Sequence, residues 1–186
     1  GIMLRGYAFS DHKSTPDAMP PVAETHLMVS SPTECEAQFS AIRAVADGVF
    51  FTRDLVSEPA NVLTTTEFAD RLESLTALGL EVEVLEEDSL AALGMGSLLC
   101  VGQGSASPSK MVVMQWNGGV KGAAPLALVG KGVVFDTGGI SIKPAGGMED
   151  MTMDMGGAGV VAGVMKTLAM RKAKANVVGL VGLVEN

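Results

Sequence analysis

The sequence has few of the residues on which several classes of protein depend. Aromatic residues make up 4% of its 186 positions, and it contains two cysteines and two histidines. The histidines, His12 and His26, do not form an HExxH zinc motif and are too few for most histidine-based sites. Cys35 and Cys100 lack CxxC spacing, so we expect buried, reduced thiols rather than a disulfide framework.

Positive charge and long apolar runs are also scarce. The formal net charge is −8, and no basic cluster is longer than "RKAK". Nucleic-acid binding depends mainly on Lys and Arg side chains that neutralise phosphates, so we expect no nucleic-acid partner. The longest apolar runs, such as "MVVM", are far shorter than the roughly 20 residues that cross a membrane, and the first residues lack a signal-peptide pattern. We therefore expect a soluble, cytoplasmic protein without membrane association.

The first part of the chain reads as an extension followed by a domain. Residues 1–31, rich in Pro, Ser, Thr and Asp after Ser10, are predicted to be a linker or arm from an upstream N-terminal domain. A helix is predicted from Pro32, which suits a first helical turn, to the break at "SEPAN". Residues 32–186 are then the domain proper.

A second helix has clear signals at both ends. Thr64 and Glu67 have the spacing of a capping box, and Leu63 and Phe68 can form a hydrophobic staple across the first turn. Gly79 supplies the stop.

Apolar runs of strand length follow. A short helix capped by Asp88 ends before Gly94, and a longer helix from 156 to about 171 carries an apolar face. That face consists of Val160, Val161, Val164, Met165 and Leu168. The predicted strands are "LEVEVL", "SLLCVGQG", "KMVVMQW", "LALVG" with "GVVF" as a strand or strand pair, and "NVVGLVGLV". This alternation predicts an α/β fold with a mixed, largely parallel central sheet flanked by helices.

Charged residues gather among glycines between two of these elements. Lys131 and Asp136 bracket "GVVF", Lys143 follows in a loop, and Asp154 lies just before the last helix. Functional groups of open α/β sheets collect at the carboxyl ends of strands, and carboxylates that converge there repel each other unless a cation neutralises them. A divalent metal would explain the cluster, with Lys131 as a neutral amine ligand and the Lys143 ammonium stabilising an oxyanion.

Other interpretations remain open for the same residues. Lys131 and Asp136 could form a surface ion pair, Lys143 could be a solvated loop lysine, and Glu149 and Asp150 are expected to be solvated. "DTG" after an apolar strand is also the pattern of an aspartic-peptidase loop, although a single copy is present. A glycine-rich phosphate cradle is a third possibility, without a P-loop or dinucleotide fingerprint to support it.

The segment "LVGKGVVFDTGGISIKPAGGMEDMTMDMGGAG" resembles the core of the leucyl (cytosol) aminopeptidase family of dinuclear metallopeptidases. The resemblance implies that Lys131, Asp136 and Asp154 are metal ligands, with Asp136 touching both ions, and that Lys143 is the catalytic lysine that polarises the scissile carbonyl. Met151 matches a position that lines the pocket for the substrate's N-terminal side chain. "TRDLVSEPANVLTTTEFA" and "LRGYAFSDHK" are similar to the start of the family's catalytic domain and to its join with the preceding domain.

The resemblance also implies a function, and it shows that one motif of the family is missing from this sequence. Two divalent ions, Mn²⁺ or Zn²⁺, would activate water for release of N-terminal residues from peptides, with a (bi)carbonate held by an arginine, in a homo-hexamer. The family's later motif Asn-Thr-Asp-Ala-Glu-Gly-Arg, which supplies two more carboxylate ligands and that arginine, does not occur here. We therefore expect an incomplete catalytic domain, a fragment whose activity requires the complete protein; the alternative is a non-catalytic binding or assembly module.

Overall fold

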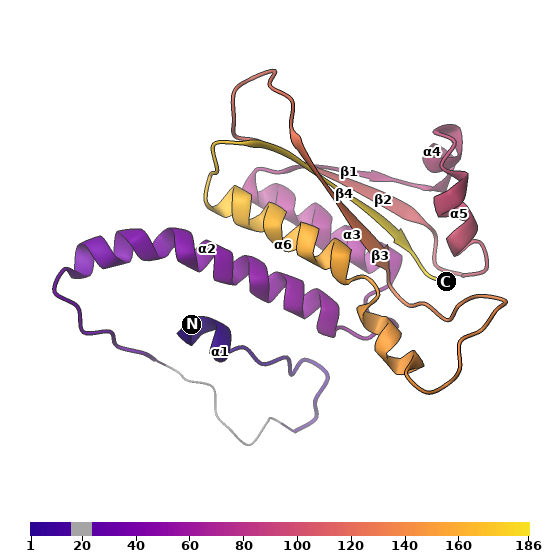
Figure 1. Cartoon of the computed structure of the whole chain (residues 1–186), viewed down its shortest axis with the longest axis horizontal. Coiled ribbons are helices and arrows are strands. Elements are labelled where there is room, and N and C mark those ends of the chain that lie inside the picture. The colour runs from indigo at the N-terminus through magenta and orange to yellow at the C-terminus, as the bar shows by residue number, and fades with distance from the viewer. Residues whose placement is uncertain (16–23) are drawn as a thin grey trace.

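A computed structural model describes residues 1–15 and 24–186. The elements run along the chain as follows: α1 (Ile2–Arg5), α2 (Pro32–Ser57), α3 (Thr65–Glu73), the 3-10 helix η1 (Ser74–Leu78), β1 (Glu81–Leu85), α4 (Glu87–Ala92), α5 (Gly96–Gly102), β2 (Lys110–Asn117), β3 (Leu126–Val133), the 3-10 helix η2 (Met148–Met153), α6 (Gly156–Met170) and β4 (Asn176–Val184). In Figure 1 the N-terminus lies at α1, beside α2, and the C-terminus lies at the end of β4. Residues 16–23 of the predicted arm lie outside the described residues.

The strands form one sheet in the order β1-β2-β4-β3. β3 pairs with β4 in parallel, whereas β1 pairs with β2 and β2 with β4 in antiparallel fashion. The mixed α/β class is confirmed, but the expectation of a largely parallel sheet is wrong for this chain. The continuous apolar runs of β2 and β4 reflect burial inside the sheet, and burial does not reveal strand direction.

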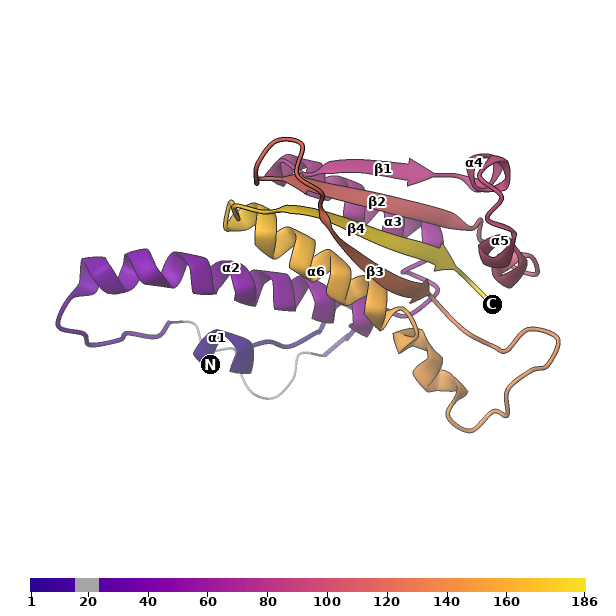
Figure 2. The same ribbon diagram turned by 45° about the horizontal axis from the view of Figure 1, so that its top comes forward.

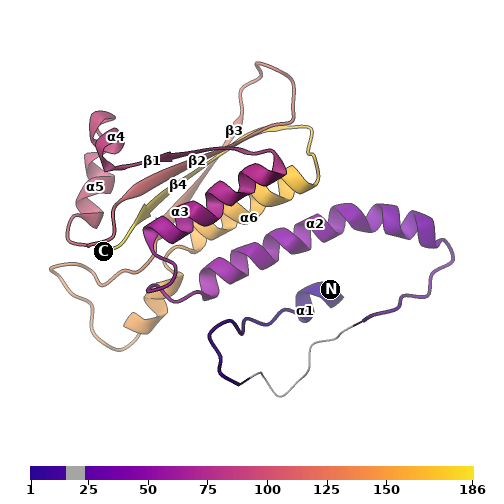
Figure 3. The same ribbon diagram turned by 180° about the vertical axis from the view of Figure 1, so that it is seen from behind.

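Helices form two layers against one face of the sheet. α3 and α6 lie against the strands, and α2 packs on the outer side of α6 (Figures 2 and 3). The core between sheet and helices contains large side chains with at most 2% exposure, among them Leu55, Phe68, Met114, Met165 and Val181.

The expected helix signals are present. α2 begins at Pro32 and ends at Ser57, before the Pro of "SEPAN". The Thr64 hydroxyl accepts a hydrogen bond from the Glu67 amide at 3.2 Å, Leu63 and Phe68 are buried, and Gly79 ends η1 with a left-handed φ of 91°. These contacts confirm the cap, the staple and the stop.

Several local expectations are wrong. "SLLCVGQG" forms α5 rather than a strand, since a short apolar run fits either element. Asp88 lies inside α4, whose N-cap is Glu86. By contrast, the strand or strand pair expected from "LALVG" and "GVVF" is confirmed as the single strand β3, which includes the beginning of "GVVF".

The expected burial also differs at exposed positions. Cys35 and Cys100 are free, as expected, but both are exposed because they lie on outward faces of α2 and α5. On α6, Val161 and Met165 are buried as expected, whereas Val160 and Val164 face outward with 55% and 39% exposure.

The N-terminal segment packs along the second half of α2. The Tyr7 ring stacks on Phe50, the Tyr7 hydroxyl donates to Asp54 at 2.7 Å, and the Arg53 guanidinium lies 3.9 Å from the ring centre. Burial and the neighbouring Asp54 raise the pKa of Tyr7 to about 12. Whether residues 1–31 come from an upstream domain stays a prediction. No helix in the described ranges 1–15 and 24–186 is long and apolar enough to span a membrane.

Candidate metal centre

The parallel pair β3 and β4 brings two carboxyl ends to the same edge of the sheet. The hydrogen bonds between these two strands continue beyond the end of β3, because the Val134 amide donates to the Val184 carbonyl at 2.9 Å. Asp136 and the loop that follows therefore begin next to the end of β4. The chain then returns through η2 to the start of α6, which lies against β3 (Figure 2).

Asp136 is held by donors on both of its carboxylate oxygens. Oδ2 lies 2.6 Å from the Lys143 ammonium, and Oδ1 accepts from the Gly138 amide at 2.9 Å and from Asn186 Nδ2 at 3.0 Å. The Lys143 ammonium contributes most to lowering the pKa of Asp136 to about 2, and these hydrogen bonds outweigh the opposite effect of partial burial. Asp136 is thus a fixed, ionised carboxylate.

Lys143 reaches back over its own loop. Its ammonium also donates to the Asp136 carbonyl at 3.0 Å and lies 3.4 Å from the Met151 sulfur. The loop closes through a 2.8 Å hydrogen bond from the Lys143 amide to the Thr137 carbonyl. Gly138 and Gly139 adopt φ values of 90° and 69°, which glycine tolerates because it lacks a Cβ. The loop therefore brings Lys143 and Met151 together beside Asp136.

Lys131 forms its ion pair with Asp154. The Lys131 ammonium lies 2.5 Å from Asp154 Oδ1. Lys131 therefore does not pair with Asp136, the alternative that the sequence left open; Asp136 pairs with Lys143 instead. Close packing of α6 on β3 allows the Lys131 to Asp154 pair: a Cβ at Gly130 would lie 2.7 Å from the Gly157 carbonyl oxygen. Asp154 directly precedes the N-cap of α6, as expected.

One oxygen of this cluster has no partner. Asp154 Oδ2 is buried and accepts no hydrogen bond. An ionised carboxylate oxygen that is buried without a donor is costly, and a bound cation would satisfy it. The donor chemistry of two carboxylates and one lysine amine, once deprotonated, suits Mn²⁺ or Zn²⁺. Within the described residues no group of three or more His, Cys, Asp and Glu side chains is placed to hold a metal.

Two further acidic residues of this region behave as expected. Glu149 and Asp150 are exposed. Glu185 lies outside the cluster and accepts from the Ser107 hydroxyl at 3.0 Å.

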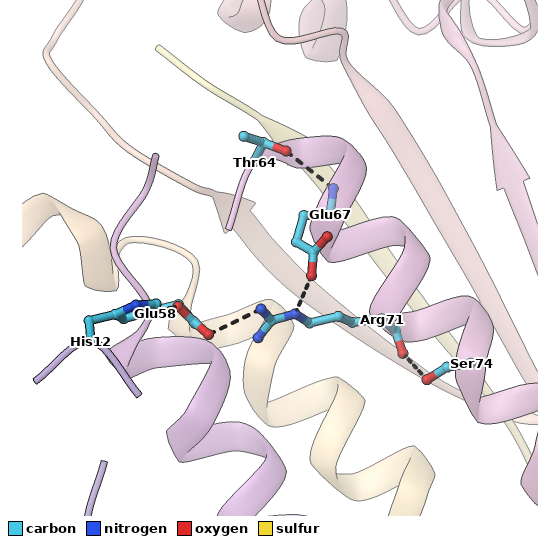
Figure 4. Close-up of polar contacts among 6 residues, drawn as sticks. All are labelled: His12, Glu58, Thr64, Glu67, Arg71 and Ser74. Atoms are coloured by element: carbon cyan, nitrogen blue, oxygen red, sulfur yellow. Dashed lines mark hydrogen bonds and ion pairs between the residues drawn. The ribbon is translucent and has the colours of Figure 1, made fainter. Parts of the chain in front are cut away.

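The sequence did not indicate Asn186 or a second polar cluster at the end of α2. There, Glu58 is 5% exposed and pairs with His12 at 2.7 Å and with Arg71 at 3.0 Å (Figure 4). Arg71 also donates to Glu67 at 2.8 Å. Although burial raises it, hydrogen bonds from His12 and Arg71 hold the pKa of Glu58 below its ordinary value. This cluster joins the N-terminal segment to α2 and α3.

Comparison with known families identifies the family of this chain. The family described as the cytosol aminopeptidase family, catalytic domain, matches residues 50–186. The chain belongs to the cytosol aminopeptidase family. It is 70% identical to a "Probable cytosol aminopeptidase" of Dinoroseobacter shibae and 65% identical to one of Cereibacter sphaeroides, over all of this chain and 38% of each relative.

Solved structures agree with this family. The cytosol aminopeptidase of Coxiella burnetii superposes with a TM-score of 0.84 at 25% identity, over 99% of this chain and 38% of that one. The bottromycin maturation enzyme BotP in complex with Mn superposes with a TM-score of 0.81 at 34% identity, over the same shares. The chain thus spans little more than a third of the length of these relatives.

Membership of the cytosol aminopeptidase family corrects one alternative. The aspartic-peptidase interpretation of "DTG" is wrong, because the family is one of metallopeptidases. The geometry gives the physical reason: Asp136 is paired with Lys143 and has a pKa of about 2, so it does not share a proton with a second carboxylate.

Proposed function

We propose that this chain is the first part of the catalytic domain of a metal-dependent aminopeptidase that releases N-terminal residues, leucine among them, from peptides. The activity belongs to a protein of the relatives' length that contains this chain, called here the complete protein. One observation carries the proposal most directly: a buried oxygen of the Asp154 carboxylate accepts no hydrogen bond, although the other oxygen of this carboxylate pairs with Lys131.

Each residue has a chemical role in this proposal. Lys131, Asp136 and Asp154 would hold two ions, Mn²⁺ or Zn²⁺, with Asp136 touching both. When bound, such ions act as Lewis acids and lower the pKa of coordinated water. Lys143 places its ammonium at the edge of the site, where it stabilises negative charge on the scissile carbonyl oxygen. Met151, in contact with Lys143, lines the pocket for the substrate's N-terminal side chain.

Features of the complete protein follow from the same proposal. It acts as a homo-hexamer in the cytoplasm, and further carboxylates complete the metal sites beside an arginine that holds a (bi)carbonate. Peptides are its substrates, and neither nucleic acid nor membrane is a partner.

Turnover of leucine p-nitroanilide by the purified complete protein tests the activity. We expect cleavage that EDTA abolishes and Mn²⁺ restores, and a kcat about 10²- to 10³-fold lower in Lys143→Ala, because a charge aimed at the developing oxyanion is lost. Lys121→Ala, which removes a lysine from the exposed loop between β2 and β3, is the matched control. Full activity of Lys143→Ala would contradict the role of Lys143. Mn²⁺ binding without any turnover would support the non-catalytic binding module instead.

A further inference from the structure

Asn186 lies directly opposite Asp136 where the ladder between β3 and β4 runs on past the strands. The Asn186 amide donates to the Phe135 carbonyl at 3.0 Å, and the Asn186 carbonyl accepts from the Thr137 amide at 2.6 Å. These main-chain bonds involve both neighbours of Asp136, so Asn186 has a fixed register relative to that residue. Its side chain is consequently presented to Asp136 by backbone geometry.

The side-chain amide of Asn186 completes the environment of Asp136. Asn186 Nδ2 donates to Asp136 Oδ1 at 3.0 Å. On the other side, a Cβ built at Gly139 would lie 3.0 Å from Asn186 Oδ1, so the loop packs closely against the amide. The amide therefore sits between the loop and the carboxylate.

The three donors on Asp136 are not equivalent. Lys143 holds Oδ2 and the Gly138 amide holds Oδ1, but both belong to the loop after Asp136. Asn186 is the donor that comes from the neighbouring strand end. A carboxylate fixed from both directions has one orientation of its plane, and partners of this kind orient metal ligands.

We propose that Asn186 is a positioning residue that fixes the Asp136 carboxylate in the orientation that binds metal. The metal-binding part of this inference rests on the proposed function. Asn186 itself does not touch the metal or substrate; it acts through Asp136.

Two variants of the complete protein separate this role from a general structural one. Asn186→Leu has a similar branched shape, although it is larger, and cannot donate; Glu185→Gln changes the adjacent residue, whose carboxylate contacts Ser107 instead. Asn186→Ala serves if the leucine disturbs folding. Calorimetric titration with Mn²⁺, the electron paramagnetic resonance spectrum of bound Mn²⁺, and the crystal structure of the metal-free variant are the readouts.

We expect Asn186→Leu to bind Mn²⁺ about 10- to 100-fold more weakly, the range for loss of an outer-shell partner. We also expect a changed Mn²⁺ spectrum and a rotated Asp136 side chain in the metal-free crystal, with Glu185→Gln like the wild type throughout. Unchanged Mn²⁺ affinity, or an unmoved Asp136 side chain, in a folded variant would overturn the positioning role. Failure of the wild type to bind Mn²⁺ would refute the proposed function instead, and the metal-free crystal would still decide whether Asn186 orients Asp136.

Discussion

The lysine and aspartate side chains of the candidate metal centre form two separate ion pairs. Lys143 pairs with Asp136, and Lys131 pairs with Asp154 across the contact between β3 and α6. From the sequence we expected these four residues to converge, because glycine-rich segments place them at strand and helix ends; the structure joins them in two pairs. The sequence could not predict the pairing, which depends on where α6 lies along β3. Asn186 was also missed, because its role depends on the register of β4 against β3, which the sequence does not reveal.

The loop after Asp136 depends on glycine at Gly138 and Gly139, and Gly139 is the one that faces Asn186. Gly139→Ala is expected to destabilise the protein by about 1–2 kcal/mol, because φ of 69° is unfavourable for a residue with a Cβ. The new methyl group would also press on the Asn186 amide, 3.0 Å away. Thermal unfolding checks this, with Gly146→Ala as the control, since its Cβ would meet nothing within 4 Å. Equal melting temperatures for the two variants would contradict the strain.

Glu58 gives a pH-dependent prediction at the end of α2. Glu58→Gln is expected to cost about 1.5–3 kcal/mol near pH 7, because Arg71 loses a buried carboxylate partner. The folded-state pKa of Glu58 is lower than its ordinary value of 4.5. Its contribution is therefore complete above pH 4.5 and is lost as the pH falls through the folded-state pKa.

Urea unfolding of wild type and Glu58→Gln between pH 8 and pH 2.5 measures this difference. The gap in unfolding free energy should be constant at neutral pH and shrink in acid. Glu67→Gln removes the more exposed partner of Arg71 and should cost no more than about 1 kcal/mol. A gap that widens in acid would show that the sign is wrong.

At the scale of elements, α2 and α6 approach closely through glycines. A Cβ at Gly163 would lie 2.5 Å from the Gly48 carbonyl oxygen and 2.1 Å from the Thr52 hydroxyl. The Thr52 hydroxyl itself donates to the Gly159 carbonyl at 2.9 Å, so backbone and side chain interlock across the helix pair. This contact holds α2 against α6, the helix that begins beside Asp154 of the candidate metal centre.

Gly163→Ala is accordingly expected to destabilise the protein by about 1–3 kcal/mol, the usual cost of overpacking. Gly156→Ala lies on the same helix, where a Cβ would meet nothing within 4 Å, and should leave stability nearly unchanged. Melting temperatures of the two variants provide the comparison. A Gly163→Ala variant as stable as Gly156→Ala would mean that the helices can separate without cost.

Local signals predicted some elements better than others. The Thr64 cap marks the start of α3, and Gly79 marks the end of the 3-10 helix η1 that follows it, so the position of this helical segment could be predicted. α5 has an apolar run of strand length, and only its packing at the end of the sheet decides for a helix. Likewise, no short stretch of sequence encodes the relative direction of β2 and β4, because the segments that connect the strands set it.

At the scale of the whole molecule, the family could be predicted from one segment of sequence and the fold class from the alternation of helices and apolar runs. The resemblance also predicted that the set of metal ligands is incomplete. The cluster contributes carboxylates from Asp136 and Asp154 and an amine from Lys131, fewer donors than two divalent ions require. The chain spans 38% of the Dinoroseobacter relative's length, so we propose that the remaining ligands lie in the rest of the complete protein.

The most direct test is a calorimetric titration of Mn²⁺ into the complete protein and its Asp154→Asn variant. Asp150→Asn, an exposed neighbour four residues earlier, is the matched control. We expect binding by the wild type and the control, and affinity reduced by more than about 100-fold in Asp154→Asn, beyond the effect of losing an outer partner. Equal Mn²⁺ affinity in all three proteins would contradict a metal centre at this cluster.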